Sequence, residues 1–385
     1  MKLYPDAPLR HRYAQELAQR LHQEALLSDD QLDAIQAHHA DVPYAPHFFV
    51  KVGLFLFGSL AFLFGGSFFG LFFVELLGFS ICSLAYAALA GYLLVRLIRT
   101  KKLRFAGADN ALLYGITGAL CVPVFELYEL LRLQEVWVAA LVFLPVLFLI
   151  AYSTGEPVLA LAALGTLCTV VFSLLLQFPL GRVLLPFAGL LLGVLVYAWT
   201  RRQLTRPGAY YWQTALEWVG LATLVVVYLC GNYGVVREAN AALNGRYEAV
   251  SPEIAFAGFF WLLTFLIPLG YLYRGIRQRD RSLLLLALLG LTASVATVQY
   301  YYPWVPAAWL LVLGGTFITA LAYTLIRLLQ TPRLGFSYVP EVPSEVPPLI
   351  EAVVLSHTTQ SLTPDTPDFQ LGGGDFGGGG AGERY

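Results

Sequence analysis

Charged residues are scarce in this chain of 385 residues. Only 13% are Asp, Glu, Lys or Arg, whereas 58% are hydrophobic. Soluble domains carry about 25% charged residues, so this balance excludes an ordinary soluble protein and predicts a chain whose main partner is the lipid bilayer. The formal net charge is −1. Because there is no excess of positive charge to attract a polyanion, we expect no nucleic-acid partner.

Cysteine and catalytic motifs are also sparse. Cys82, Cys121, Cys168 and Cys230 each lie alone inside an apolar run, without the close spacing of zinc sites or disulfide frameworks. The chain has no phosphate-binding glycine loop, no dinucleotide-binding glycine turn, no His-Glu-x-x-His helix and no Gly-x-Ser-x-Gly elbow. We therefore predict reduced thiols, no cofactor and no metal, and we disfavour an enzyme.

Long apolar runs fill the middle of the chain. A helix needs about 20 apolar residues to cross a bilayer, and the candidate runs are 48–69, 72–98, 110–131, 136–152, 157–177, 183–200, 213–234, 253–273, 282–302 and 304–329. The runs 110–131 and 136–152 are weaker, because the first contains two glutamates and the second is short, so they could form a re-entrant pair. The sequence predicts an all-α polytopic bundle of about ten spans over 48–330.

The distribution of positive charge orients these spans. Short loops rich in Lys and Arg stay on the cytoplasmic side of a membrane. If the N-terminus is cytoplasmic, only four of the 24 Lys and Arg residues would lie on the outer side, namely Arg132, Arg182, Arg237 and Arg246. This asymmetry predicts that both ends of the chain are cytoplasmic.

The polar segment 1–47 predicts a small helical hairpin. Leu9, Tyr13, Leu17 and Leu21 recur every four residues, which places an apolar stripe along a helix that begins near Asp6. Ser28 and Gln31 have the spacing of a capping box, so a second helix is expected to start there. The segment lacks the apolar core and cleavage site of a signal peptide, and we expect the first span to target the chain.

Five of the six histidines lie in this hairpin: His11, His22, His38, His39 and His47. A metal site is the specific interpretation. However, no pair has the i, i+4 spacing that aims two imidazoles at one ion, so a solvated helix surface is favoured.

The segment 331–385 is rich in proline and then in glycine. Pro340, Pro343, Pro347 and Pro348 favour an extended conformation, and the glycines at 372–374 and 377–380 have no side chains to bury. We predict a disordered cytoplasmic tail that acts as a spacer or binds a proline-recognising protein.

The hairpin and the first span carry a resemblance. The segment Ala25-Leu26-Leu27-Ser28-Asp29-Asp30-Gln31-Leu32, followed by a first span opening at Phe48 to Phe64 with Gly58, Gly65 and Gly66, resembles a family of bacterial predicted membrane proteins that is known only as a domain of unknown function. The resemblance covers about residues 10–70. It implies a bacterial inner-membrane location and no particular activity.

One group of charged residues is a candidate site. Glu126 and Glu129 are three residues apart near the outer end of the run 110–131, with Arg132 three further on, so the three should share one helix face. Two neighbouring carboxylates in a membrane can bind a cation or a proton, because their repulsion raises the pKa of one of them. Alternatively, they form a solvated rim at the membrane surface, which we favour.

Three functions remain open from the sequence. The first is a non-enzymatic structural, sensory or partner-anchoring protein that uses 1–47 and 331–385 to bind cytoplasmic proteins. The second is a secondary transporter or channel that uses Glu126 and Glu129. The third is a membrane enzyme acting on lipid-linked substrates through the outer loop from Gly231 to Pro252, which carries Arg237, Glu238, Arg246 and Glu248, with Glu253 at its edge.

Overall fold

The chain folds into helices joined by short connections. The computed structural model describes residues 2–327 except 24–25, 45, 133–134, 247–250, 279 and most of 304–326. Its helices are α1 (Asp6–Gln23), α2 (Asp29–His38), α3 (Phe48–Leu77), α4 (Phe79–Lys101), α5 (Ala108–Leu130), α6 (Val136–Thr154), α7 (Pro157–Leu175), α8 (Gly181–Leu204), the 3-10 helix η1 (Ala209–Tyr211), α9 (Gln213–Gly231), α10 (Tyr233–Leu243), α11 (Ala257–Gln278) and α12 (Arg281–Tyr301).

The helices α3 to α9, α11 and α12 are long and apolar enough to cross a membrane. Among the described residues there are nine such helices and no strand beyond an isolated bridge between Tyr44 and Leu103. The predicted all-helical architecture of a multi-pass membrane protein is therefore confirmed. The tenth predicted span, 304–329, falls mostly outside the described residues, and so does the whole predicted tail, 331–385.

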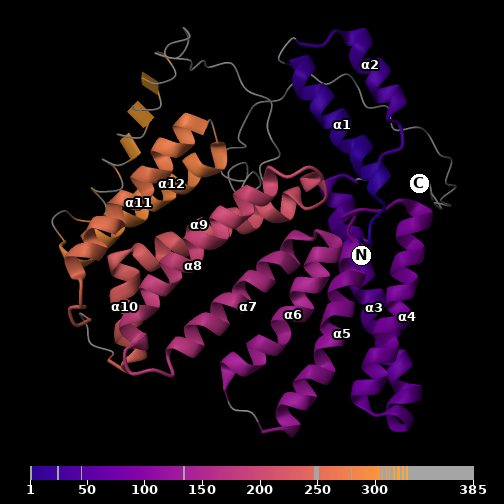
Figure 1. The fold of residues 1–385 in the computed structure, drawn as a ribbon, viewed down its shortest axis with the longest axis horizontal. Helices are drawn as coiled ribbons and strands as arrows, with labels where there is room; N and C mark the ends of the chain where they lie inside the picture. The colour runs from indigo at the N-terminus through magenta and orange to yellow at the C-terminus, as the bar shows by residue number, and fades with distance from the viewer. Residues whose placement is uncertain are drawn as a thin grey trace, which may run out of the picture. The chain divides into compact units, whose positions relative to one another are not determined.

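Neighbouring long helices pair in antiparallel hairpins, α4 with α5, α6 with α7, α8 with α9 and α11 with α12 (Figure 1). Helix α9 lies at the centre, because it contacts α7, α8, α10, α11 and α12. Helix α3 has no buried residue, as expected for a helix that is apolar all round and faces lipid. We call the end of the bundle that carries α1, α2 and the connections 102–107, 155–156 and 205–212 the hairpin end, and the other the opposite end.

The largest difference from the predicted spans is the boundary between the first two. The expected break between the first two spans, at residues 70–71, is wrong: α3 continues through Gly70 to Leu77, and the turn lies at Gly78, whose φ is 76°. The run around residue 70 is rich in Phe and Leu and has no proline or cluster of polar residues that would mark a turn there. Only glycine adopts the φ of Gly78 without strain. The two weaker predicted spans form the complete helices α5 and α6 rather than shorter re-entrant segments.

The predicted outer loop from Gly231 to Pro252 contains an additional helix, α10. Asn232 caps it, because its side chain accepts a hydrogen bond from the backbone N–H of Val235 at 3.1 Å. The helix is only 11 residues long, so it is too short to cross a bilayer. It packs against α8, α9 and α11 at the opposite end of the bundle (Figure 1).

The N-terminal hairpin is confirmed. Helix α1 begins at Asp6, and the capping box of α2 is formed by reciprocal hydrogen bonds between Ser28 and Gln31 at 3.0 and 3.3 Å. The predicted apolar stripe of α1 is only partly covered. Leu9 is buried, whereas Tyr13 and Leu17 remain 45% and 46% exposed.

Two prolines inside helices each free a backbone carbonyl, and a serine on the neighbouring helix satisfies it. Pro268 of α11 cannot donate to the carbonyl of Thr264, which instead accepts a 2.6 Å hydrogen bond from the hydroxyl of Ser294 in α12. Pro123 of α5 likewise has no N–H to donate to the carbonyl of Ala119. This carbonyl accepts a 2.8 Å hydrogen bond from the hydroxyl of Ser83 in α4. Because lipid supplies no hydrogen bonds, these serines stabilise the two proline-containing helices.

Candidate functional site

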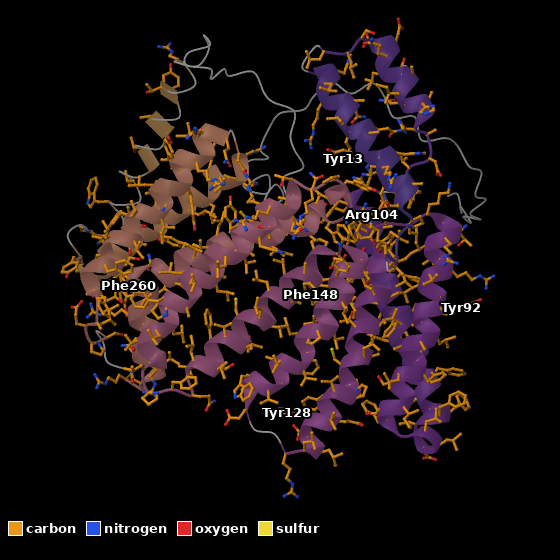
Figure 2. The ribbon with its side chains drawn as sticks, in the orientation of Figure 1. Tyr13, Tyr92, Arg104, Tyr128, Phe148 and Phe260 are labelled. Carbon is orange, nitrogen blue, oxygen red and sulfur yellow. The ribbon has the colours of Figure 1, made fainter. Side chains whose placement is uncertain are left out.

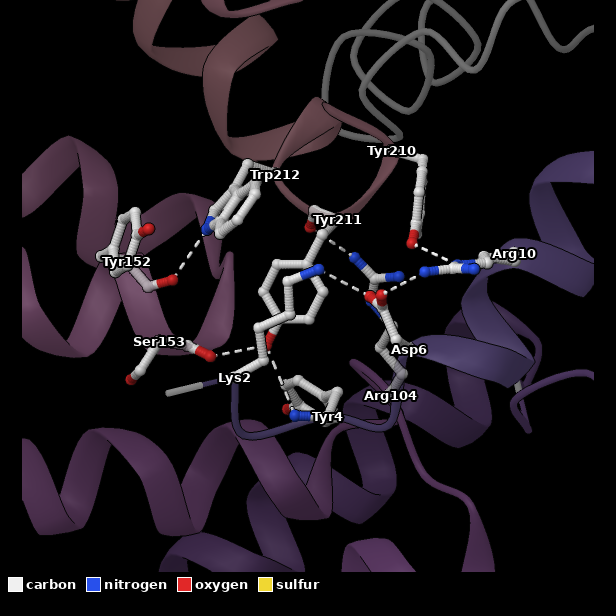
Figure 3. A network of polar contacts seen from close by, with 10 residues as sticks. All are labelled: Lys2, Tyr4, Asp6, Arg10, Arg104, Tyr152, Ser153, Tyr210, Tyr211 and Trp212. Atoms are coloured by element: carbon white, nitrogen blue, oxygen red, sulfur yellow. Dashed lines mark hydrogen bonds and ion pairs between the residues drawn. The ribbon is translucent and has the colours of Figure 1, made fainter. Parts of the chain in front are cut away.

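The N-terminal segment is bound at the hairpin end by the start of α5, the end of α6 and η1; its contacts with Ser153 and Tyr211 are drawn in Figure 3. Tyr4 is 2% exposed. Its hydroxyl donates to Oδ2 of Asp109 at 2.9 Å, and its backbone N–H donates to the hydroxyl of Tyr211 at 3.3 Å. The backbone N–H of Leu3 donates to the carbonyl of Ser153 at 2.8 Å. The segment therefore enters the bundle where helices α5, α6 and α9 begin or end.

Asp109 is fully buried and is held by three donors. It accepts the backbone N–H groups of Phe105 at 2.7 Å and Ala106 at 2.8 Å in addition to the Tyr4 hydroxyl. It also stands in the first turn of α5, where the helix dipole stabilises negative charge. Gly107 makes this turn possible, because its φ is 104° and a Cβ there would overlap the carbonyl of Lys51. The turn thus positions Asp109 to receive Tyr4.

Tyr211 forms the other wall of the Tyr4 site. It is fully buried, and its hydroxyl donates to the carbonyl of Ser153 at 2.5 Å. The guanidinium of Arg104 donates to the backbone carbonyl of Tyr211 at 2.8 Å and lies 5.5 Å from its ring. Burial raises the pKa of Tyr211 and lowers that of Arg104 from their ordinary values. Tyr211 consequently stays neutral, and it ties the connection 205–212 to the end of α6.

A partly exposed set of charges surrounds this buried contact. Asp6 forms ion pairs with Lys2 at 2.7 Å and with Arg10 at 3.2 Å. Burial alone would raise the pKa of Asp6, but the hydrogen bonds from Lys2 and the neighbouring groups outweigh it and lower the pKa. Arg10 also donates to the hydroxyl of Tyr210 at 2.9 Å, and the Lys2 ammonium lies 5.1 Å from the ring of Trp212. These contacts hold the first turn of α1 on η1.

The other end of the hairpin is held as well. The ammonium of Lys102 is 2.5 Å from a carboxylate oxygen of Asp41, and the backbone N–H of Tyr44 donates to the carbonyl of Lys102 at 3.0 Å. Within the hairpin, the side-chain amide of Gln15 donates to the carbonyl of His39 at 2.8 Å. The hairpin is therefore attached to the bundle before α1 and after α2.

Glu156 lies in the turn between α6 and α7. This turn has Gly155 at φ 66° and Pro157 in the first position of α7, but Glu156 is 1% exposed. Its carboxylate accepts from Tyr114 at 2.6 Å, from Asn110 at 3.3 Å and from the backbone N–H of Leu159 at 2.7 Å. Burial raises its pKa, against the opposing effect of these donors. Asp109 and Asn110 are adjacent, so they bring Tyr4 and Glu156 into one buried polar cluster.

The histidines are closer together than their spacing suggests. His11 of α1 and His39 at the end of α2 have ring centroids 5.0 Å apart, because the hairpin folds one helix onto the other. Within the described part of the chain, however, no group of three or more His, Cys, Asp or Glu side chains could hold a metal ion.

Glu126, Glu129 and Arg132 lie at the opposite end of α5, where Tyr128 is labelled in Figure 2. Both carboxylates are exposed, and Glu126 accepts a hydrogen bond from the hydroxyl of Ser80 in α4. Arg132 does not continue the helix: α5 ends at Leu130, and Arg132 has a φ of 50°. The expectation that all three share one helix face is therefore wrong for Arg132. Cation or proton binding by the two carboxylates stays a prediction.

A second polar cluster surrounds α10 at the opposite end. Arg237 is 8% exposed, and its Nε donates to the carbonyl of Ser251 at 2.9 Å while the guanidinium lies 4.5 Å from the ring of Tyr301. Glu238 accepts from the hydroxyls of Tyr301 at 2.5 Å and Ser251 at 2.6 Å. Burial and a hydrogen bond to Glu253 raise the pKa of Tyr233 to about 12. The sequence predicted these charges in an outer loop but did not indicate that Arg237 is buried or that Glu238 is hydrogen-bonded to Tyr301 and Ser251.

Polar side chains continue from this cluster between α9 and α12. Asn232 donates to the hydroxyl of Tyr228 at 3.0 Å and to Thr297 at 3.2 Å. The Tyr228 hydroxyl donates to the carbonyl of Gly290 at 2.8 Å and lies 3.1 Å from the hydroxyl of Ser294. These bonds fix α9 and α12 against each other, and none of these side chains carries a charge. No sequence pattern indicated the network, because its members lie far apart in the chain.

The comparisons with known proteins supply no counterpart from which the role of the two polar clusters could be inferred. Comparison of the chain with protein-family models, with curated proteins and with solved structures finds no match.

Proposed function

We propose that this chain is a non-enzymatic, partner-anchoring protein of the bacterial inner membrane that presents the hairpin of α1 and α2 to another protein in the cytoplasm. The observation that carries the proposal is the attachment of the hairpin to the bundle on both sides. Tyr4 is inserted between Asp109 and Tyr211, and Asp41 and Tyr44 are held by Lys102. A flexible tether would need neither contact.

This attachment favours a binding module that is held rigidly on the bundle over one that is flexibly tethered. Fixing a module before binding removes part of the conformational entropy that binding would otherwise cost. Helix α2 has no buried residue, and Asp29, Asp30 and Asp33 are exposed on it. An acidic exposed helix is complementary to a partner surface with basic side chains.

The charge asymmetry supports a cytoplasmic location for the hairpin end. The end of α4 and the connections at this end carry Lys101, Lys102, Arg104 and Arg206, whereas Arg132, Arg182, Arg237 and Arg246 lie at the opposite end. Positively charged loops stay on the cytoplasmic side.

Sidedness is the first part of the test. In a variant without the four native cysteines, a single cysteine at Asp33 or at Arg246, both exposed, is treated in intact cells with a maleimide that does not cross membranes. We expect labelling at position 246 and protection at 33 until the cells are opened. The reverse pattern would place the hairpin outside and reject a cytoplasmic partner.

Partner capture is the second part. A photoreactive amino acid replaces Leu17 or Asp33 on the hairpin, and Arg246 serves as the control position at the opposite end. We expect a discrete protein adduct from the hairpin positions that Tyr4→Phe weakens and that position 246 does not form. If the hairpin positions yield only lipid adducts, or the same adducts as position 246, the proposed function is wrong.

A further inference from the structure

A cavity of about 290 Å³ opens at the opposite end of the bundle, beneath α10. Its interior is formed by apolar or weakly polar side chains from five helices, represented by Phe172, Pro186, Val226, Cys230, Leu243 and Phe260. Phe260 is labelled in Figure 2 at the start of α11. An apolar lining of this kind favours apolar ligands.

The mouth of the cavity is polar and positively charged. Arg182, at the first turn of α8, and Asn240, on α10, both line it. The Arg182 guanidinium is exposed and donates to the side-chain oxygen of Asn244 at 2.8 Å, and Asn244 in turn donates to the side-chain oxygen of Asn240 at 3.2 Å. An apolar interior with a cationic rim is complementary to an amphiphile that carries a negative headgroup.

The position of the cavity relative to α10 favours a lipid over a soluble ligand. Only Asn232 separates helix α10 from the end of α9, and the Val235, Val236 and Leu243 side chains of α10 line the cavity. A short amphipathic helix at the ends of the spans lies where lipid headgroups meet the acyl chains. Arg182 is consequently at headgroup level. Cys230, next to the last residue of α9, lies beside Gly189, seven residues further into α8 than Arg182, so Cys230 and Val226 lie deeper in the hydrocarbon.

We propose that this cavity binds one acyl chain of an anionic phospholipid, with its phosphate on Arg182. A cavity of about 290 Å³ lies at the lower end of the size range of ligand pockets, which suits part of one acyl chain rather than a whole lipid. The remainder extends into the bilayer through the open side. This inference does not depend on the proposed function of the hairpin, which lies at the other end of the bundle.

The test uses the full chain reconstituted in phosphatidylcholine vesicles that contain a small fraction of phosphatidylglycerol with a photoreactive diazirine in its acyl chain. Labelled positions are mapped by mass spectrometry of peptides. The expected result is labelling concentrated in residues 226–243, at least fivefold above the same diazirine probe on phosphatidylcholine. Labelling spread evenly over all spans, or equal labelling by the two probes, would overturn the proposal.

Matched variants separate cavity binding from general lipid contact. Ala239 and Ala242 are both exposed on α10, but only Ala239 lines the cavity. We expect Ala239→Phe to lower labelling about tenfold, the loss of some 1.4 kcal/mol of binding, and Ala239→Leu to lower it by less. Ala242→Phe should leave it unchanged. Equal effects at the two positions contradict the proposal.

Arg182→Gln tests the headgroup contact. Its side chain can still donate to Asn244 but carries no charge, so labelling by the phosphatidylglycerol probe should fall about fivefold, and labelling by the phosphatidylcholine probe should not change. An unchanged preference for phosphatidylglycerol would remove Arg182 from the site. The melting temperature of each variant is recorded, and Ala239→Leu decides the result if Ala239→Phe fails to fold.

Discussion

The hydroxyl of Tyr4 donates a 2.9 Å hydrogen bond to Asp109, 105 positions further along the chain. Asp109 also receives the backbone N–H groups that form the turn before α5. The N-terminal segment therefore supplies one of the donors of a carboxylate that shapes the bundle itself. Attachment of the hairpin and the local structure at the start of α5 are coupled through this one side chain.

Tyr4→Phe should loosen the hairpin without unfolding the bundle. The ring keeps its packing, but Asp109 loses a buried donor, which costs about 1–3 kcal/mol. We expect faster tryptic cleavage after Arg10 and Arg12 in membranes and a lower melting temperature. Tyr13→Phe is the control, because Tyr13 is 45% exposed. Similar acceleration by both substitutions would contradict a specific role for the Tyr4 hydroxyl.

Glu156 predicts a pH dependence of stability. Burial raises its pKa in the folded chain above its ordinary value of 4.5, so the folded state holds the proton more tightly than the unfolded state does. Its contribution is fully present below about pH 4.5 and is lost as the pH rises through the raised pKa. Melting temperatures between pH 4 and 8 should therefore decline less steeply in Glu156→Gln than in the unmodified chain. Glu129→Gln, at an exposed position, should leave the profile unchanged, and parallel profiles for all three proteins would reject the prediction.

The bond between Ser294 and the carbonyl of Thr264 should matter only while Pro268 is present. Ser294→Ala removes the donor to this carbonyl, and we expect a loss of about 0.6–1.7 kcal/mol, as for other hydrogen bonds between membrane helices. Pro268→Ala restores a backbone N–H that can bond to Thr264, so Ser294→Ala should cost less in that background. A double-mutant cycle of unfolding free energies measures the difference. Additive effects would show that the serine does not replace the missing backbone bond.

Arg237 should hold the segment 251–254 against α10. Arg237→Lys keeps the charge but loses the planar fork that reaches both the carbonyl of Ser251 and the hydroxyl of Tyr233. We expect faster hydrogen exchange in 251–254 and a loss of about 1–3 kcal/mol. Arg246→Lys, at an exposed position, is the control. Unchanged exchange at 251–254 in Arg237→Lys would argue against this role.

Glu126 distinguishes a surface rim from a transport site. Because its carboxylate is exposed at the end of α5, we expect a single cysteine at position 126 to react quickly with an impermeant maleimide applied to intact cells. Protection, together with labelling at position 246, would favour the transporter hypothesis. In that case, loss of ion flux into vesicles in the combined Glu126→Gln and Glu129→Gln variant would be the next measurement.

Local patterns predicted the helices well. The spans follow from uninterrupted apolar composition, and the start of α2 follows from Ser28 and Gln31, which are only three residues apart. These signals depend on neighbours in the chain, so the sequence contains them completely. Where the local signal was weak, as in the Phe-rich run around Gly70, the boundary was misplaced by eight residues, because apolar side chains do not mark a turn and the actual break lies at Gly78.

The sites, in contrast, depend on contacts across the chain. The sequence by itself determined the helical membrane bundle, the N-terminal hairpin and the uneven distribution of positive charge. Only the tertiary structure decided that Tyr4 reaches Asp109, that Glu156 is buried rather than solvated in its turn, and that Arg182 meets an apolar cavity beneath α10. The physical reason is that hydrogen bonds and burial depend on distance in space, whereas apolar periodicity and capping depend on distance along the chain.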